Sequence, residues 1–187
     1  MRTIKNIILL ATIVLSFQAC EIENNERPNI LFILSDDHTS QAWGIYGGIL
    51  EDYVYTPSIS KLADEGCVLD NCLVSNSICV PSRATILTGQ YSHVNGVKNL
   101  WHRLMPEQDN IAKHLQAGGY STALIGKWHL KEEPSGFDHY CVLPGQGVYW
   151  NPVMKTKENW ADGGVSYEGF STDVIADMTI DWIEQRD

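Results

Sequence analysis

The sequence predicts an α/β fold, a three-layer α/β/α sandwich with a largely parallel central sheet. The run at residues 29–34 is apolar at all but its first position, as expected of a strand that is covered on both faces. Two further strand-like segments follow, at 67–74 and 120–129, and segments with helical signals separate the three. This alternation of strands and helices is typical of a parallel sheet with helices on its faces.

Residues 1–19 have the organisation of a secretory signal peptide. Arg2 and Lys5 precede a mostly apolar run at 7–17, which is shorter than the roughly 20 residues of a membrane-spanning helix. Cys20 follows directly, so we expect lipidation of the new N-terminus as in bacterial lipoproteins, with simple cleavage and release as the alternative. The protein is therefore expected to be exported, either periplasmic or anchored to the outer membrane as a lipoprotein.

The polar segment at 20–27 is expected to be a lipoprotein tether, and the folded part begins at Pro28. Removal of the signal peptide takes away two basic side chains and no acid, so the formal charge changes from −10 to −12. An acidic body argues against a nucleic-acid partner and gives no general attraction to an anionic substrate. Recognition of an anion must then come from local positive groups.

Asp36 and Asp37 stand just after the first predicted strand. In parallel sheets, ligands bind at the carboxyl ends of the strands. Two adjacent carboxylates repel each other, so a hard divalent cation is one reason to place them there. Capping of the turn into the next element is the other reason, and these residues alone do not decide between the two.

The segment at 56–66 predicts a helix, because it has a cap residue, a proline in its first turn, apolar residues at helical spacing and a terminal glycine. The strand-like segment at 67–74 follows it. Cys67 and Cys72 would lie on opposite faces of that strand, too far apart for a disulfide. Their spacing also fits no zinc motif.

A polar loop leads to Cys79, just before a short helix predicted at 81–89. Pro81 suits the first turn of this helix and Gly89 its end. Free N–H groups and the positive end of the helix dipole favour an anion near the cysteine. Arg83 can lie on the same helical face and add a permanent positive charge. The structural alternative is a buried cysteine beside a solvated arginine.

A second helix is predicted at 110–117, where two glycines end it, and the third strand follows at 120–129. Lys127 and His129 close that strand, at the edge where ligands bind. One residue separates them, so their side chains would point to the same face in an extended chain. The alternative is that both are solvated.

Two stretches of the chain resemble the signatures of the type I sulfatases, which belong to the alkaline-phosphatase-like superfamily. The first is Cys-x-Pro-Ser-Arg-x-x-x-Leu-Thr-Gly, which matches at every fixed position from Cys79 to Gly89. The second runs from Gly119 to His129 and resembles the other signature throughout. The resemblance implies the alkaline-phosphatase-like form of the sandwich, with residues 28–187 as the N-terminal part of a sulfatase catalytic domain.

The resemblance also implies two cofactors. Cys79 would be oxidised after synthesis to formylglycine by a formylglycine-generating enzyme, and the hydrated aldehyde would be the nucleophile that attacks sulfur. Asp36 and Asp37 would be calcium ligands, together with the oxygen at position 79. We therefore expect Ca²⁺ and formylglycine at this site.

Arg83, Lys127 and His129 are implied to contact the sulfate group of a sulfated glycan, which makes the expected protein a sulfuric ester hydrolase. Members of the family are much longer, and their further calcium ligands, a second sulfate-binding lysine and the leaving-group acid lie in the part that this chain lacks. We therefore expect this part alone to hold calcium weakly and not to turn over substrate. The exception would be a site that Asp138 and His139 complete.

The stretch at 136–152 is aromatic and rich in turn residues, which predicts an extended surface loop. It is similar to the corresponding region of bacterial sulfatases that act on sulfated amino sugars. The expected substrate is thus N-acetylglucosamine-6-sulfate or a related glycosaminoglycan or mucin sugar. Residues 171–186 then predict an amphipathic helix. Its apolar stripe consists of Val174, Ile175, Met178, Trp182 and Ile183.

Two functions of other classes stay open. A phosphoesterase or phosphonate hydrolase of the same superfamily would share the metal-bearing sheet. Such an enzyme more usually has Ser or Thr as its nucleophile, so Cys79 with Pro81 and Arg83 argues against it. An inactive, glycan-binding lipoprotein is compatible with every residue of the sequence.

Overall fold

The computed structural model describes residues 27–186, and residues 1–26 and 187 lie outside that range. The predicted signal peptide at 1–19, its basic residues, Cys20 and nearly all of the tether are therefore outside the described residues. The chain divides into two compact units, residues 1–38 and residues 39–187. All helices and strands named below belong to the second unit.

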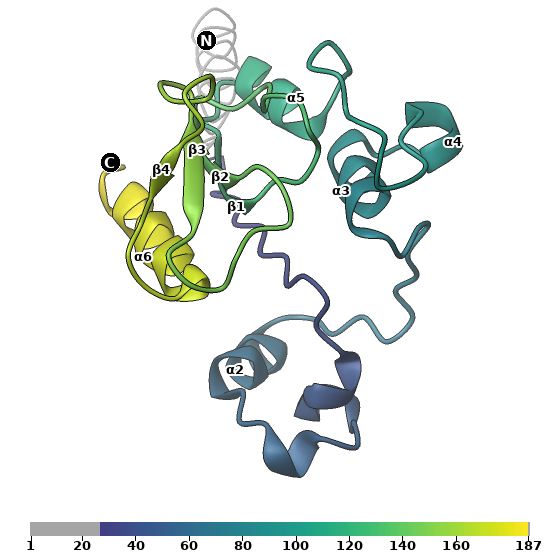
Figure 1. Ribbon diagram of the computed structural model, residues 1–187. Helices are drawn as coiled ribbons and strands as arrows, with labels where there is room; N and C mark the ends of the chain where they lie inside the picture. The colour runs from purple at the N-terminus through teal and green to yellow at the C-terminus, as the bar shows by residue number, and fades with distance from the viewer. Residues whose placement is uncertain (1–26, 187) are drawn as a thin grey trace, which may run out of the picture. The chain divides into compact units, whose positions relative to one another are not determined.

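Four strands form one sheet with the spatial order β1-β2-β3-β4 (Figure 1). They are β1 (Ala123–Lys127), β2 (His139–Leu143), β3 (Val153–Thr156) and β4 (Val165–Ser166). β1 and β2 are parallel, and Lys127 pairs with Leu143 at their carboxyl ends. The other two pairs are antiparallel, so the sheet is mixed among the described residues. A sheet with flanking helices agrees with the predicted α/β class.

The helices form largely where local signals predict them. The α-helices are α2 (Pro57–Glu65), α3 (Cys79–Thr88), α4 (Ser92–Asn95), α5 (Ile111–Ala117) and α6 (Ser171–Glu184). Three 3-10 turns precede them: η1 (Ser40–Ala42), η2 (Gly44–Tyr46) and η3 (Glu51–Tyr53). The Asn110 side chain caps α5 by accepting the N–H of Lys113 at 3.1 Å. Gly89 ends α3 with φ 64°, a conformation that glycine adopts at little cost.

β2 is the centre of the core because both of its faces are buried. Tyr140 and Val142 belong to one apolar cluster with residues of α3 and the segment after β1. Cys141 and Leu143 point to the opposite face, where Met154 completes a second cluster. On that face the second cluster packs against α6. The predicted apolar stripe of α6 is confirmed in the N-terminal half of the helix, where Ile175 and Met178 contact the cluster. Ile183 is exposed.

Two predicted strands are absent among the described residues. The run at 29–34 has no strand assignment, because a strand exists only through hydrogen bonds to a neighbour and the described part of its unit, 27–38, holds no other strand. The segment at 67–74 is also irregular, with a turn at Asp70 and Asn71. Asp and Asn favour turns through side-chain bonds to the backbone, which interrupts the strand pattern. Cys67 and Cys72 lie there as exposed free thiols.

The prediction of a surface loop at 136–152 is wrong, because this stretch contains β2. The aromatic and glycine content of this stretch concealed a four-residue apolar run, Tyr140 to Leu143, in which every residue is buried. The turn-rich part is restricted to residues after 143. β1 and its parallel partner β2 are therefore joined by a connection that contains no helix.

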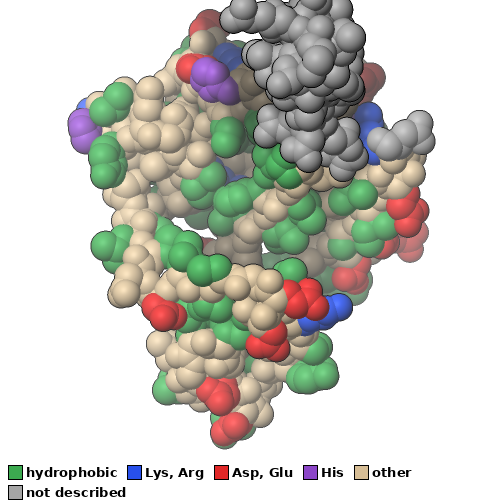
Figure 2. All heavy atoms as spheres, turned by 180° about the vertical axis from the view of Figure 1, so that it is seen from behind, with side chains coloured by type: hydrophobic (Ala, Val, Ile, Leu, Met, Phe, Trp, Pro, Cys, Tyr) green, Lys and Arg blue, Asp and Glu red, His purple; other side chains and the backbone are tan. Residues whose placement is uncertain are grey.

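Apolar side chains remain exposed on several elements of the second unit, and Figure 2 shows green patches among polar surface on one face of the molecule. Scattered apolar side chains are normal at a protein surface, so only clusters of them beside polar groups indicate a binding site. Among the described residues, no helix combines the length and apolarity that a membrane crossing requires.

Candidate active site

Cys79 is the first residue of α3 and is half-buried, so the helix begins two residues earlier than predicted. Ile78 precedes it in extended conformation, and its carbonyl accepts the N–H of Ser82 at 2.9 Å. The Asn76 side-chain oxygen accepts the N–H of Ile78 at 3.2 Å and turns the chain into the helix. Pro81 still falls in the first turn, where N–H groups lack helical partners. Position 79 thus lies at the positive end of the α3 dipole.

Arg83 links α3 to the end of β1. Its Nη1 donates a hydrogen bond of 2.5 Å to the backbone carbonyl oxygen of Lys127. The side chain is half-buried, so the alternative in which Arg83 points into water is wrong. A hydrogen bond from a charged donor contributes about 1.5–3 kcal/mol. The bond joins the two segments that carry most of the predicted site residues.

Apolar packing fixes the same two segments. Val80 and Ala84 on α3 are completely buried in one cluster with Trp128 and Leu130, which follow β1. The Trp128 N–H donates to the carbonyl of Leu143 at 2.9 Å, and its indole N–H donates to the carbonyl of residue 132 at 2.6 Å. The backbone around Lys127 is therefore held by packing and by hydrogen bonds from both sides.

Lys127 and His129 do not alternate along one extended strand. β1 ends at Lys127, and His129 has φ 56°, in the left-handed region that non-glycine residues rarely adopt. The premise of the predicted alternation is therefore wrong, because the chain turns at His129. The imidazole is buried, with only 8% of the residue exposed, so the alternative of a solvated histidine is also wrong.

Gln146 contacts one of the predicted site residues, and no local sequence signal indicated it. The Lys127 Nζ donates to its side-chain oxygen at 3.1 Å. Gln146 follows the carboxyl end of β2, and because Lys127 pairs with Leu143, both side chains emerge at the same edge of the sheet. Recognition of the apolar run at 140–143 as a strand would have placed Gln146 there.

Asp36 and Asp37 lie in the first unit, and both are exposed. They form a turn, in which Asp37 has φ 55°, a conformation that Asp tolerates better than most residues. Cys79 belongs to the second unit. The calcium site that combines all three residues therefore stays a prediction.

Asp138 and His139 do not complete the site formed at the end of β1. His139 pairs with Ala123, at the opposite end of the strand from Lys127. The Asp138 carboxylate accepts the backbone N–H of Thr122 at 2.9 Å and the Gln116 amide at 2.6 Å. These bonds favour the charged carboxylate and hold the pKa of Asp138 below its ordinary value. Its role is to fix the start of β1.

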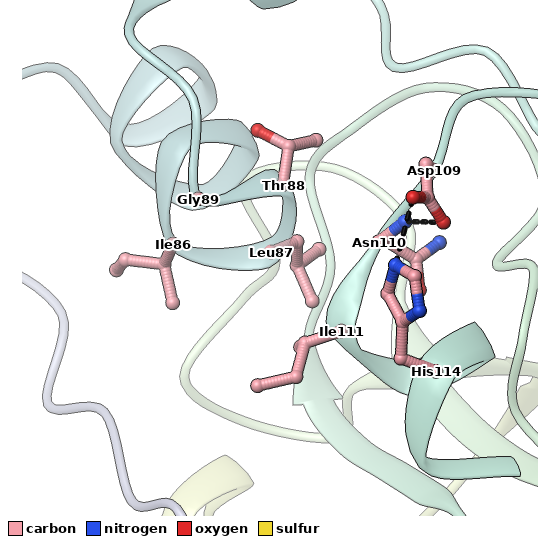
Figure 3. A pocket seen from close by; sticks show the side chains of 8 residues that line it. All are labelled: Ile86, Leu87, Thr88, Gly89, Asp109, Asn110, Ile111 and His114. Atoms are coloured by element: carbon pink, nitrogen blue, oxygen red, sulfur yellow. Dashed lines mark hydrogen bonds and ion pairs between the residues drawn. The ribbon is translucent and has the colours of Figure 1, made fainter. Parts of the chain in front are cut away.

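A pocket of about 190 Å³ lies at the opposite end of α3 from Cys79 (Figure 3). Ile86, Leu87 and Ile111 give it an apolar wall, and the His114 imidazole pairs with Asp109 at 2.7 Å on its rim. None of the predicted site residues lines it. This pocket is therefore separate from the predicted site.

Comparison with known proteins gives a family match. A model of the sulfatase family matches residues 28–187. The chain is 42% identical over 194 residues to the N-acetylglucosamine-6-O-sulfatase of Bacteroides thetaiotaomicron, with 100% of this chain and 33% of that protein covered. It is 37% identical over 129 residues to arylsulfatase G of Rattus norvegicus, with 63% of this chain and 24% of that protein covered.

A solved structure gives the same match. The chain resembles a protein determined in complex with its substrate D-glucosamine-2-N,6-O-disulfate, at a TM-score of 0.80 and 42% identity. The similarity covers 87% of this chain and 32% of that one. The chain thus spans a third or less of the length of these relatives.

Proposed function

The chain belongs to the sulfatase family, and from this membership we propose that the protein is a sulfuric ester hydrolase that removes sulfate from a sulfated carbohydrate. The bond between Arg83 and Lys127 carries the proposal. It joins one sulfatase-like signature to the other, from the N-terminal half of α3. A chance match in one signature would not explain why the other lies beside it.

The residues at this edge suit an anionic ester. Hydrolysis of a sulfate monoester needs positive groups on the oxygens and an oriented nucleophile. Arg83 supplies a guanidinium whose fork matches a pair of oxygens, and Lys127 supplies an ammonium that Gln146 orients. The α3 N-terminus adds partial positive charge, and we assign to His129 a hydrogen bond to the sulfate or to the hydrated aldehyde. These local charges offset the acidic character of the chain.

We propose that a formylglycine-generating enzyme oxidises Cys79, which makes that enzyme an obligatory partner. Formylglycine, when hydrated, supplies an oxygen nucleophile and a route for release of the sulfate. The chain's contribution is orientation. The half-buried first turn of α3 fixes the backbone at position 79, and packing of Val80 and Ala84 prevents the turn from shifting away from Lys127.

We also propose that Asp36 and Asp37 bind Ca²⁺. Their carboxylates are the hard oxygen donors that this ion prefers, whereas the thiol of an unmodified Cys79 is not. Calcium takes about 6–8 oxygen ligands, so the two carboxylates and an oxygen at position 79 supply about half of the shell. The ion would add positive charge beside the sulfate.

The proposed substrate is a 6-O-sulfated N-acetylglucosamine or a related glycosaminoglycan or mucin sugar. Two observations support it: the 42% identity to an N-acetylglucosamine-6-O-sulfatase and the likeness to a structure with bound D-glucosamine-2-N,6-O-disulfate. Export and a lipid anchor at Cys20 agree with an extracellular glycan and remain part of the proposal.

The test is production of a version of the protein extended to the length of its relatives, together with a maturation enzyme, followed by a panel of sulfated monosaccharides, aryl sulfates and phosphate esters. We call the product of this expression the matured protein. We expect sulfate release from 6-sulfated N-acetylglucosamine, loss of release in Cys79→Ala, and formylglycine at position 79 by peptide mass spectrometry. Activity on phosphate esters alone would support the phosphoesterase alternative. Glycan binding by a matured protein without turnover would support the non-catalytic alternative.

A further inference from the structure

An exposed aromatic surface lies close to the candidate active site. We call it the aromatic platform, and it consists of Tyr149, Trp150 and Phe170. The loop that carries Tyr149 and Trp150 begins at the carboxyl end of β2, where Leu143 pairs with Lys127. Two residues separate Tyr149 from Gln146, so the Cα atoms of these two residues are at most about 10 Å apart. The platform therefore starts within reach of an oligosaccharide whose sulfate lies at the ammonium that Gln146 orients.

The rings are held from two sides. Tyr149 stacks on Phe170 with ring centroids 6.3 Å apart, and Trp150 meets Phe170 edge-on at 5.5 Å. The backbone of Trp150 forms an isolated antiparallel bridge with Phe170, and the carbonyl of Tyr149 accepts the N–H of Ser171 at 2.7 Å. The N–H of Asn151 donates to the carbonyl of residue 169 at 2.8 Å. The platform is thus anchored to the start of α6, which packs on the sheet.

The outer surfaces of the platform are open. Tyr149 is 77% exposed and Trp150 is 68% exposed, and no described residue covers them. Isolated exposed rings are common, but here the rings are fixed and two of them lie on the loop that follows Gln146. An apolar, aromatic surface next to a few oriented polar groups is the composition of small-molecule sites.

We propose that the aromatic platform is a subsite for the sugar ring next to the sulfated one in the substrate. One face of a pyranose ring presents C–H groups with partial positive charge, and the face of an aromatic ring is negative, so the two attract each other. The inference rests on the proposed function, because it needs a sulfated sugar held by Lys127 and Arg83. It adds that the protein prefers an oligosaccharide to a monosaccharide.

The alternative occupants are another segment of the protein or a second copy of the chain. Either one would bury the platform permanently, so its loss would destabilise the protein without changing substrate preference. A sugar subsite has the opposite signature. Its loss lowers the preference for longer substrates, while the free energy of unfolding hardly changes.

The test uses the matured protein and compares 6-sulfated N-acetylglucosamine with glycosaminoglycan and mucin-type tetrasaccharides that carry the same terminal residue. We expect the ratio of kcat/KM for tetrasaccharide to that for monosaccharide to fall about tenfold in Trp150→Ala, which corresponds to about 1.4 kcal/mol. Trp150→Phe keeps an aromatic face and should retain most of the ratio. Trp101→Ala is the matched control, because Trp101 is 83% exposed and outside the platform.

An unchanged ratio in Trp150→Ala and Tyr149→Ala overturns the inference, as does hydrolysis of the monosaccharide without any hydrolysis of tetrasaccharides. In both cases the proposed function survives, because the monosaccharide is still hydrolysed. A lower unfolding midpoint with an unchanged ratio assigns the platform to protein packing. Failure to hydrolyse any sulfated sugar overturns the inference and the proposed function together.

Discussion

Replacement of Arg83 by methionine tests whether its bond to Lys127 holds the candidate site together. Methionine keeps much of the side-chain length and removes the donor, so the carbonyl of Lys127 loses a charged partner at 2.5 Å. Loss of such a bond costs about 1.5–3 kcal/mol at a half-buried position. With a urea m-value of about 1–3 kcal/mol per molar, the unfolding midpoint should fall by roughly 1 M.

Arg103→Met is the matched control for this experiment. Arg103 also forms a short bond, at 2.6 Å to Glu132, but its side chain is 60% exposed. Exposed ion pairs contribute at most about 1 kcal/mol, so the control should shift the midpoint much less. Urea denaturation followed by circular dichroism measures both. A shift in Arg83→Met no larger than that in Arg103→Met would refute the idea that the half-buried bond fixes the two segments.

Three further changes should be measurable. Gln146→Ala should lower kcat/KM of the matured protein with no comparable loss of stability, because it frees the Lys127 ammonium without exposing the core. Steady-state kinetics and urea unfolding midpoints of both proteins measure the two effects. Burial, and next the charge of Arg186, lower the pKa of His139 from its ordinary value of 6.5, against an opposing effect of Glu158. The neutral ring is therefore favoured in the folded state, so His139 contributes stability above pH 6.5 that is lost as the pH falls below it. The melting temperatures of wild type and His139→Gln, measured from pH 8 to 5, should differ most at the basic end and converge at the acidic end. Calcium titration of the 187-residue chain should give weak binding that Asp37→Asn abolishes, and tight binding would contradict the expected half-filled shell.

The sequence predicts the helices better than the strands, for a physical reason. The signals that define α5, the Asn110 cap and the glycines after 117, act within a few residues of one another. A strand instead depends on a partner that is distant in sequence. The apolar run at 29–34 has the composition of a strand and no assignment, whereas β2 lies within a stretch whose turn residues indicate a loop.

The same distinction applies to the candidate site. Cys79 and Arg83 could be identified because the signature is local, and so could Lys127. Gln146 could not, because its relation to Lys127 depends on the parallel register of β1 and β2. Motifs identify residues within one segment, whereas contacts between segments follow from packing.

The turn after β2 shows how one glycine fixes such a contact and gives a last prediction. Gly147 has φ 81°, and a Cβ there would lie 2.9 Å from Leu143 Cδ1, at the point where the chain folds back beside the end of β2. An L-residue in this conformation costs about 1–2 kcal/mol. Gly145, in the same turn, has open space around it. Gly147→Ala should therefore lower the urea midpoint and displace Gln146 from Lys127, and Gly145→Ala should do neither. Because Leu143 also pairs with Lys127, the Gly147 substitution should additionally slow sulfate release by the matured protein. Equal effects of the two substitutions would mean that the turn does not set the position of Gln146.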